Sequence, residues 1–133
     1  MSDKMNVLSE RFQATFQSND REEQATVFSD EPSYISGGPM RGSRYTGKKV
    51  VLDAFERASI IIQVERGDME LLLAENHSIW KMHVEGRSQI TDQPHANDLL
   101  FIFEVRNGKV RQVRENLDTI APARTCGDLP YLR

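Results

Sequence analysis

The sequence is poor in cysteine, in long apolar runs and in clustered positive charge. Cys126 is the single cysteine among 133 residues, so neither a disulfide framework nor a cysteine-rich metal cluster is available. No apolar run approaches the roughly eighteen residues of a membrane span. The N-terminal segment also lacks an apolar stretch of signal-peptide length. We therefore expect a cytoplasmic protein that contacts no membrane.

Charge is balanced and scattered along the chain. The 17 basic and 20 acidic residues give a net charge of -3, and they include no block of Lys or Arg. The sequence also lacks the aromatic-basic platform of a nucleic-acid-binding surface. No spacing of His, Asp and Glu predicts a metal site, and no Ser-His pair predicts a nucleophile elbow. We expect no nucleic-acid partner, no metal and no other cofactor.

What the sequence does contain fits one α+β domain. A chain of 133 residues buries roughly two thirds of its unfolded surface, so we interpret residues 1–133 as a single domain with an irregular tail over 120–133. Apolar residues at helical spacing predict two N-terminal helices, the second capped by Asn19, and a third helix that begins near Gly47. The stripes consist of Met5, Leu8, Phe12 and Phe16 in the first helix, and of Val51, Phe55, Ala58 and Ile62 in the third.

Strands are predicted to follow the helices. A short strand over 33–36 runs into a loop rich in Gly and Pro. Alternating segments predict further strands at 69–75, 78–90, 97–106 and 109–119. Helices that precede a run of antiparallel strands indicate an α+β fold, with the helices packed on one face of a curved sheet.

The final hairpin places a charged residue in an apolar setting. Asn107-Gly108 separates two alternating segments, and this pair is the strongest short signal for a type I′ turn of two residues. Side chains alternate faces along a strand, so Glu115 is predicted to point towards apolar neighbours. Desolvation raises the pKa of such a carboxyl group and fits it for proton transfer near neutral pH. The neighbours predicted on that face are Leu100, Ile102, Val113 and Leu117.

A second interpretation of Glu115 stays open. Glu115 lies near a strand end, where it can reach solvent or pair with Arg87 or Arg114 and play a structural role alone.

Two segments resemble a known family. "GGPMRGSRYTGKKVVLDAF" and "TDQPHANDLLFIFEVRNGKVRQVRENLDT" are similar to the SnoaL-like polyketide cyclase group of the nuclear transport factor two-like superfamily. Ketosteroid isomerases and limonene epoxide hydrolases belong to the same superfamily. The resemblance covers roughly residues 5–120 and implies a cone of strands, closed by helices, around a deep apolar pocket.

The acids of ketosteroid isomerases have no counterpart in this chain. That mechanism needs a base carboxylate on the first strand and a protonated acid on the penultimate strand. The resemblance maps the first position to Ser36 and Gly37, and the second to Leu100 and Phe101. Steroid isomerisation by that mechanism is therefore excluded.

The resemblance to limonene epoxide hydrolases matches more of the site. It maps Tyr34 and Ser36 onto a Tyr-x-Asn pair, His83 and Glu85 onto an Arg-x-Asp pair, and Glu115 onto a final acid. Only the tyrosine is identical. His83 in place of arginine removes a permanent cation, and Ser36 in place of asparagine removes an amide.

His83 and Glu85 also have a simpler interpretation. The apolar face of the strand predicted at 78–90 consists of Trp80, Met82 and Val84, so this pair shares the opposite face with Lys81 and Arg87. That pattern is typical of a solvated face, and a one-residue slip or bulge would turn the pair inward. His77 and His95 are predicted in exposed turns.

Three functions stay open at this stage. The first is a cofactor-independent isomerase, cyclase or hydrolase that acts on a small hydrophobic cyclic metabolite. The second is a non-catalytic module that binds such a molecule. The third is an interaction protein whose cone is filled by its own side chains. The catalytic candidates are Glu115, Tyr34, His83 and Glu85, and the ligand-binding candidates are Ser36, Phe55, Leu100, Ile102, Val113 and Leu117.

Apolar residues predicted on the outer side of the sheet indicate a homodimer. Monomers rarely expose a contiguous apolar patch of more than a few hundred Å², so a second copy is expected to cover this side across a two-fold axis. The alternative is a monomer whose tail covers the patch with Leu129, Tyr131 and Leu132. The residues predicted to face outward are Phe101, Phe103, Val105 and Val110, with Trp80 and Met82 beside them.

Overall fold

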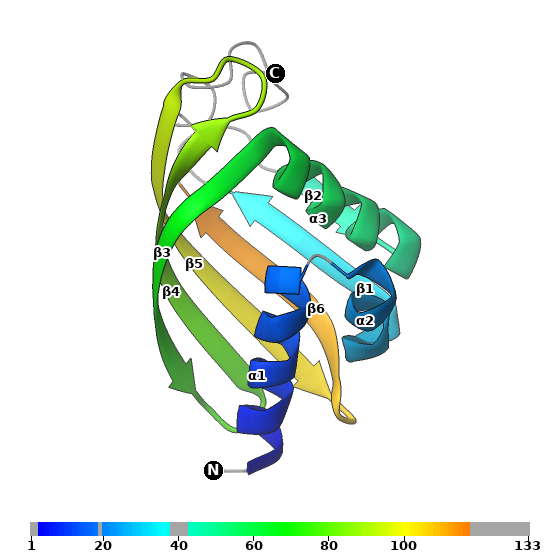
Figure 1. Ribbon diagram of the computed structural model, residues 1–133. Helices are drawn as coiled ribbons and strands as arrows, with labels where there is room; N and C mark the ends of the chain where they lie inside the picture. The colour runs from blue at the N-terminus through cyan, green and yellow to red at the C-terminus, as the bar shows by residue number, and fades with distance from the viewer. Residues whose placement is uncertain (1–2, 19, 38–42, 118–133) are drawn as a thin grey trace.

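Three helices lie on one side of a curved sheet in the computed structural model, which describes residues 3–18, 20–37 and 43–117 (Figure 1). This arrangement confirms the predicted α+β class. None of the helices in these ranges is both long and apolar enough to cross a bilayer. The helices are α1 (Asp3–Ser18), α2 (Arg21–Val27) and α3 (Lys48–Ile61). The strands are β1 (Phe28–Gly37), β2 (Ser43–Thr46), β3 (Ile62–Leu73), β4 (His77–Ser88), β5 (Pro94–Arg106) and β6 (Lys109–Leu117).

The strands lie in the order β2-β1-β6-β5-β4-β3. The pairing of β1 with β6 is parallel, and the other neighbouring strands are antiparallel. The first long strand and the last therefore lie side by side although the rest of the sheet separates them in sequence. We call the side of the sheet that carries the helices the inner face and the opposite side the outer face (Figure 1).

The predicted helices are present, with changes at their ends. Asp20 caps α2, because its Oδ1 accepts the backbone N–H of Glu22 at 3.0 Å and of Glu23 at 3.2 Å. The predicted cap, Asn19, lies outside the described residues. Gly47 precedes α3 with a φ of 98°, a conformation that glycine adopts without strain. Its N–H donates to the Pro32 carbonyl at 2.9 Å, which holds the start of α3 against β1.

Some predicted boundaries need correction. β1 begins at Phe28 rather than at 33, and β2 occupies part of the predicted loop. The apolar stripe of α3 ends at Phe55, because Ala58 is exposed and Ile62 already begins β3. The side chains of Met5 and Phe16, and the tail over 120–133, lie outside the described residues.

The predicted turn between β5 and β6 is confirmed, but a bulge follows it. Asn107 and Gly108 have φ angles of 53° and 74°, as a type I′ turn requires. Val105 pairs with Val110, whereas Glu104 pairs with Gln112. One extra residue in β6 therefore shifts the register by one, and a shift of one exchanges the two faces of the sheet.

The bulge reverses the predicted partners of Glu115. Phe101, not Leu100, lies opposite Glu115, while Leu100 and Ile102 pair with Asn116 and Arg114 on the outer face. The prediction that Leu100 and Ile102 share the face of Glu115 is therefore wrong. The predicted outward aromatic patch is wrong for the same reason. Its members Phe101, Phe103, Val110 and Trp80 are all buried in the core.

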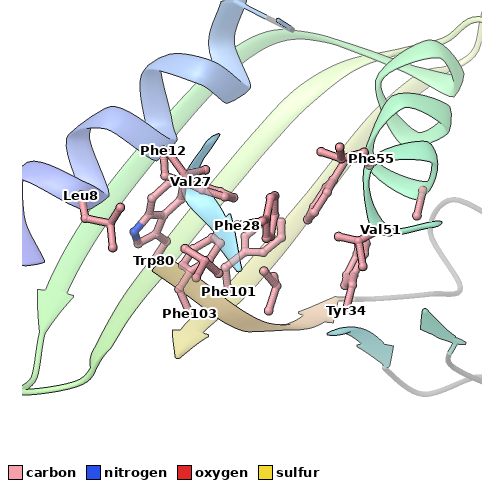
Figure 2. Packing of buried hydrophobic residues seen from close by; sticks show 14 residues of the cluster. Leu8, Phe12, Val27, Phe28, Tyr34, Val51, Phe55, Trp80, Phe101 and Phe103 are labelled. Carbon is pink, nitrogen blue, oxygen red and sulfur yellow. The ribbon is translucent and has the colours of Figure 1, made fainter. Parts of the chain in front are cut away.

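Aromatic rings from the helices and the sheet fill the centre of the inner face (Figure 2). The Phe12 ring of α1 lies 5.5 Å from Phe28, 5.4 Å from Trp80 and 4.6 Å from Phe103. Burial of each ring contributes about 1.5–3 kcal/mol. The Ser78 hydroxyl accepts hydrogen bonds from Ser9 at 2.8 Å and from Trp80 at 2.9 Å, so α1 is fixed to β4 by polar contacts as well.

Candidate functional site

Glu115 lies on the inner face, among aromatic residues. It sits on β6 between Phe101 of β5 and Ser36 of β1, and Phe101 in turn pairs with Trp80 of β4. Only 8 % of Glu115 is exposed. The predicted burial of this carboxyl group is therefore confirmed, although the residues that bury it differ from those predicted.

The Tyr34 hydroxyl donates a hydrogen bond to Glu115 Oε1. β1 and β6 run parallel here, so Tyr34 pairs with Val113 and Ser36 pairs with Glu115. Tyr34 therefore lies on the inner face of β1, two residues before the partner of Glu115. Its ring stacks on Phe55 of α3, with centroids 4.6 Å apart and planes within 6°. The ring of Tyr45 on β2 also lies beside the Tyr34 ring, with centroids 5.6 Å apart. Packing from a helix and a second strand thus fixes the hydroxyl that points at the carboxyl group.

Burial raises the pKa of Glu115 from 4.5 to about 7, and the Tyr34 hydrogen bond partly opposes the rise. The cause is loss of water around the charged form, whereas a donated hydrogen bond favours that form. Near neutral pH both forms are populated. Such a group can donate a proton to a substrate oxygen or accept one from carbon or water.

The other inward candidates lie around this pair. Ser36 is buried beside Glu115, and Val113 is fully buried opposite Phe103. Leu117 is half-buried and pairs with Leu99.

His83 and Glu85 lie on the outer face and are not brought together with Glu115. They alternate along β4 with Met82 and Val84, which point inward. His83 Nδ1 lies 2.8 Å from Asp98 Oδ1, and its Nε2 lies 3.5 Å from Glu85 Oε1. The Asp98 contact first, and the Glu85 contact second, raise the pKa of His83. These contacts form a solvent-facing charge cluster on the sheet.

Two surface hollows lie away from the Tyr34–Glu115 pair. One, of about 350 Å³, lies near Glu85, Arg87 and His95. The other, of about 470 Å³, lies between the β3–β4 turn and the β5–β6 hairpin. Neither hollow is lined by Tyr34 or Glu115.

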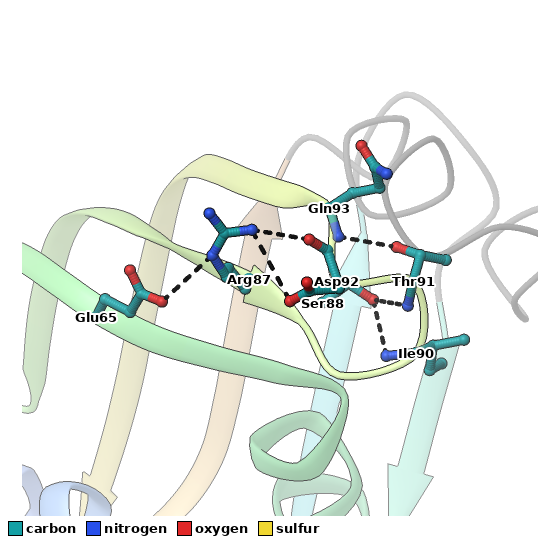
Figure 3. A network of polar contacts seen from close by, with 7 residues as sticks. All are labelled: Glu65, Arg87, Ser88, Ile90, Thr91, Asp92 and Gln93. Carbon is teal, nitrogen blue, oxygen red and sulfur yellow. Dashed lines mark hydrogen bonds and ion pairs between the residues drawn. The ribbon is translucent and has the colours of Figure 1, made fainter.

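The connection from β4 to β5 is held by its own polar contacts (Figure 3). Ser88 Oγ accepts the N–H groups of Ile90 at 3.1 Å and Thr91 at 3.2 Å. Arg87 donates to the Asp92 carbonyl at 2.8 Å and lies 3.8 Å from the Glu65 carboxylate. These contacts order the turn, so the strand ends beside it keep their register.

His95 departs from the prediction of an exposed turn. It lies within β5, opposite Gly86, and only 6 % of it is exposed. His77 is exposed at the start of β4. Across the described ranges, no three His, Cys, Asp or Glu side chains are grouped so as to hold a metal ion.

Sequence reasoning missed Phe101 as the cross-strand neighbour of Glu115, with Trp80 beyond it on β4. A signal for them exists in the spacing of β6. Val110 and Val113 are three residues apart, whereas strict alternation would place apolar residues two or four apart. Both valines are buried, so the spacing marks the bulge.

A scan against protein-family models finds no match, and a search of curated protein sequences finds none. A search of solved structures does find proteins whose fold is similar to that of this chain. An NTF2-like protein from Burkholderia xenovorans matches with a TM-score of 0.82 and 21 % identity, over 96 % of this chain and 98 % of that one. A protein of ketosteroid isomerase-like fold from Catenulispora acidiphila, in complex with trimethylamine, matches with a TM-score of 0.74 and 15 % identity, over 95 % of each chain.

An LEH-like epoxide hydrolase from M. tuberculosis matches with a TM-score of 0.70 and 12 % identity, over 94 % of this chain and 90 % of that one. At such identities the similarity concerns the fold. The chain therefore has the nuclear transport factor two-like fold, with an open, curved and mostly antiparallel sheet.

Proposed function

We propose that the protein is a cofactor-independent acid–base enzyme that acts on a small hydrophobic ketone or epoxide. The observation that carries the proposal is the buried Tyr34–Glu115 pair, in which the pKa of the carboxyl group is raised to about 7. A carboxyl group removed from water in this way is suited to proton transfer near neutral pH. Solved structures of the same fold include an epoxide hydrolase, which supports this class of reaction.

Glu115 is assigned the proton transfer and Tyr34 the positioning of the carboxyl group. Tyr34 engages Oε1, so Oε2 is assigned to the substrate. The protonated acid donates to a carbonyl or epoxide oxygen, whereas the carboxylate accepts a proton from a carbon next to a carbonyl or from an attacking water. Phe55 and Phe101 supply apolar surface that keeps the site dry and the pKa of Glu115 high.

Turnover of a ligand panel tests the proposal. Ketones and epoxides drawn from terpenoids, steroids and flavonoids are incubated with the protein in heavy or ¹⁸O-labelled water. Mass spectrometry then detects deuterium beside a carbonyl or ¹⁸O in a diol. Glu115→Gln is expected to lower any observed rate by about 10²-fold or more, the usual contribution of a general acid or base.

The matched control for turnover is Glu104→Gln. It makes the same change in the same hairpin, but on the outer face, where Glu104 lies 3.8 Å from Arg111. The control is expected to retain the wild-type rate. Equal rates in Glu115→Gln and wild type would overturn the assignment of Glu115.

A non-catalytic binding module is the second candidate. The position of both hollows away from Glu115 favours it, since a ligand bound in either hollow would not reach the carboxyl group. In that case the ligand panel raises the melting temperature without turnover. A ligand at one hundred times its Kd stabilises by about 2.7 kcal/mol.

A homodimer through the outer face remains part of the proposal, with different residues from those first predicted. Leu72, Ile79 and Ile102 pair across β3, β4 and β5 and form a continuous apolar row on this face. Leu100 and Ile35 are half-buried on the same face. A second copy related by a two-fold axis would cover this row.

A further inference from the structure

Two aromatic rings contact the ring of Tyr34, and they come from elements of different rigidity. Phe55 of α3 stacks on Tyr34 at 4.6 Å and is anchored in the core, where it also stacks with Phe28 at 5.9 Å (Figure 2). Tyr45 lies 5.6 Å from Tyr34, with the planes inclined by 39°. Tyr45 is only half-buried, and it belongs to β2, the four-residue strand at the edge of the sheet.

Strand pairing places Tyr45 directly opposite Tyr34. Residues paired across two antiparallel strands point to the same face, so both tyrosines lie on the inner face. Aromatic pairs at such positions stabilise each other's arrangement. The position of the Tyr34 ring therefore depends on β2 as well as on α3.

A cation from α3 lies over the ring of Tyr45. The guanidinium carbon of Arg57 is 5.7 Å from the ring centroid, which is within the range of a cation–π contact. Arg57 is exposed and follows Phe55 by two residues in the same helix. α3 thus contacts both tyrosines, Tyr34 through Phe55 and Tyr45 through Arg57.

The position of the Tyr34 ring matters because its hydroxyl donates to Glu115 Oε1. A tyrosine hydroxyl lies at the far end of its side chain, so a small rotation near the backbone moves it by more than a hydrogen bond tolerates. The residues paired with Glu115 across β1 and β5 are Ser36 and Phe101, neither of which carries a charge. A displaced Tyr34 ring would therefore leave burial as the dominant influence on the carboxyl group.

We propose that Tyr45 and Arg57 are positioning residues of the site: Tyr45 holds the Tyr34 hydroxyl on Glu115, and Arg57 holds Tyr45. The inference rests on the proposed function of Glu115 in proton transfer. Both residues act through Tyr34 rather than on the substrate. A line of contacts thus joins the exposed surface of α3 to a carboxyl group of which only 8 % is exposed.

Carboxyl ¹³C NMR of Glu115 tests the inference and needs no ligand. Tyr45→Leu is expected to lower the ratio of bonded to displaced Tyr34 hydroxyl about two- to tenfold, the range that one aromatic pair provides. The hydrogen bond lowers the pKa of Glu115, so its partial loss is expected to raise that pKa above about 7. Tyr45→Phe keeps the ring and is expected to leave the pKa at about 7. An unchanged or lowered pKa in Tyr45→Leu would overturn the role of Tyr45.

A double-mutant cycle separates positioning from a merely structural role. If Tyr45 acts through the Tyr34 hydroxyl, Tyr45→Leu has no further effect on the pKa of Glu115 once Tyr34 is replaced by Phe. Tyr34→Phe alone is expected to give the larger rise, and the double variant the same rise. An effect of Tyr45→Leu that is equal in both backgrounds would mean that the ring acts on packing or solvent access, and would overturn the inference.

Arg57→Gln tests the outer end of the line of contacts without a change in the core. The pKa of Glu115 is expected to rise less than in Tyr45→Leu, because an exposed cation–π contact changes such a ratio by about two- to fivefold. Arg44→Gln is the matched control, since Arg44 precedes Tyr45 but is exposed on the outer face opposite Ile35. It is expected to leave the pKa unchanged. Equal shifts in the two arginine variants would reveal a general effect of charge and overturn the role of Arg57.

The outcomes separate this inference from the function on which it depends. A rise in Tyr34→Phe but not in Tyr45→Leu overturns the positioning role and leaves proton transfer by Glu115 in place. A wild-type pKa near the ordinary value of about 4.3 overturns the proposed function itself. If Tyr45→Leu does not fold, Tyr45→Val replaces it, because a β-branched residue suits a strand, and the same rise is expected.

Discussion

At the scale of single residues, burial and the hydrogen bond from Tyr34 act in opposite directions on the pKa of Glu115. Burial disfavours the carboxylate, and the hydrogen bond from Tyr34 favours it. Within the described residues, burial and the Tyr34 hydrogen bond are the effects that set the pKa of Glu115, and no arginine or lysine contributes. The charged residues of the outer face are separated from it by the sheet itself.

Tyr34→Phe is expected to raise the pKa of Glu115 above about 7. The substitution keeps the ring stacked on Phe55 but removes the hydroxyl that favours the carboxylate. Carboxyl ¹³C NMR of the labelled protein measures the pKa. Tyr45→Phe is the control, because Tyr45 packs beside Tyr34. A pKa that falls in Tyr34→Phe would show that the hydroxyl acts in the opposite sense.

Stability is expected to fall as pH rises from about 4.5 to about 7, because Glu115 is protonated over this range in the folded chain and ionised in the unfolded chain. The folded state then binds more protons, so deprotonation disfavours it. The loss amounts to about 3 kcal/mol, as a rise of 2 to 3 pKa units implies. Above pH 7 both states are ionised and the advantage is gone.

Urea unfolding of wild type and Glu115→Gln measures this effect as a difference between the two proteins. The glutamine does not ionise, so the difference in free energy of unfolding should change over that pH range. Parallel pH profiles would mean that Glu115 is not buried as an acid.

At the scale of elements, the bulge in the β5–β6 hairpin determines which residues meet Glu115. Phe101→Ala is expected to destabilise by about 3–5 kcal/mol, because it removes a buried ring from the core. Ile102→Ala is expected to cost less, since Ile102 is half-buried on the outer face. Chemical denaturation checks the order, and a larger cost at Ile102 would contradict the register.

Sequence patterns predicted the elements better than they predicted the faces. Asn107-Gly108 has a local chemical reason for its turn, and Val51 and Phe55 have a local helical period, so both were predictable. The bulge has no such local chemistry, because it depends on which register buries Phe101, Phe103 and Val113 together. A prediction from strict alternation, which omits the bulge, therefore placed Glu115 correctly on the buried face but assigned it the wrong cross-strand neighbours.

The resemblance to epoxide hydrolases had a similar limit. It identified Tyr34 and Glu115, which hydrogen-bond in the structure. It also mapped His83 and Glu85, which lie on the outer face, although alternation along β4 had indicated that face. Motif matching predicts which residue types correspond between two proteins. The face of the sheet on which each side chain lies depends on the strand register of this chain.

At the scale of the whole molecule, the outer face is the surface that the proposed dimer would cover. Ile79→Glu is expected to convert a dimer to a monomer, because it places a charge at the centre of the apolar row. Val50→Glu is the control, since Val50 is 45 % exposed on α3, away from the outer face. Sedimentation velocity distinguishes the forms. A wild-type monomer at micromolar concentration would contradict the dimer.

The central claim is that Glu115 is an acid–base group buried beside Tyr34, and its titration by carboxyl ¹³C NMR tests this most directly. The spectrum is followed from acid to mildly basic pH, and the Glu115 signal is assigned by its absence from Glu115→Gln. An apparent pKa of about 7 is the predicted result. An apparent pKa near the ordinary glutamate value of about 4.3 would contradict the claim.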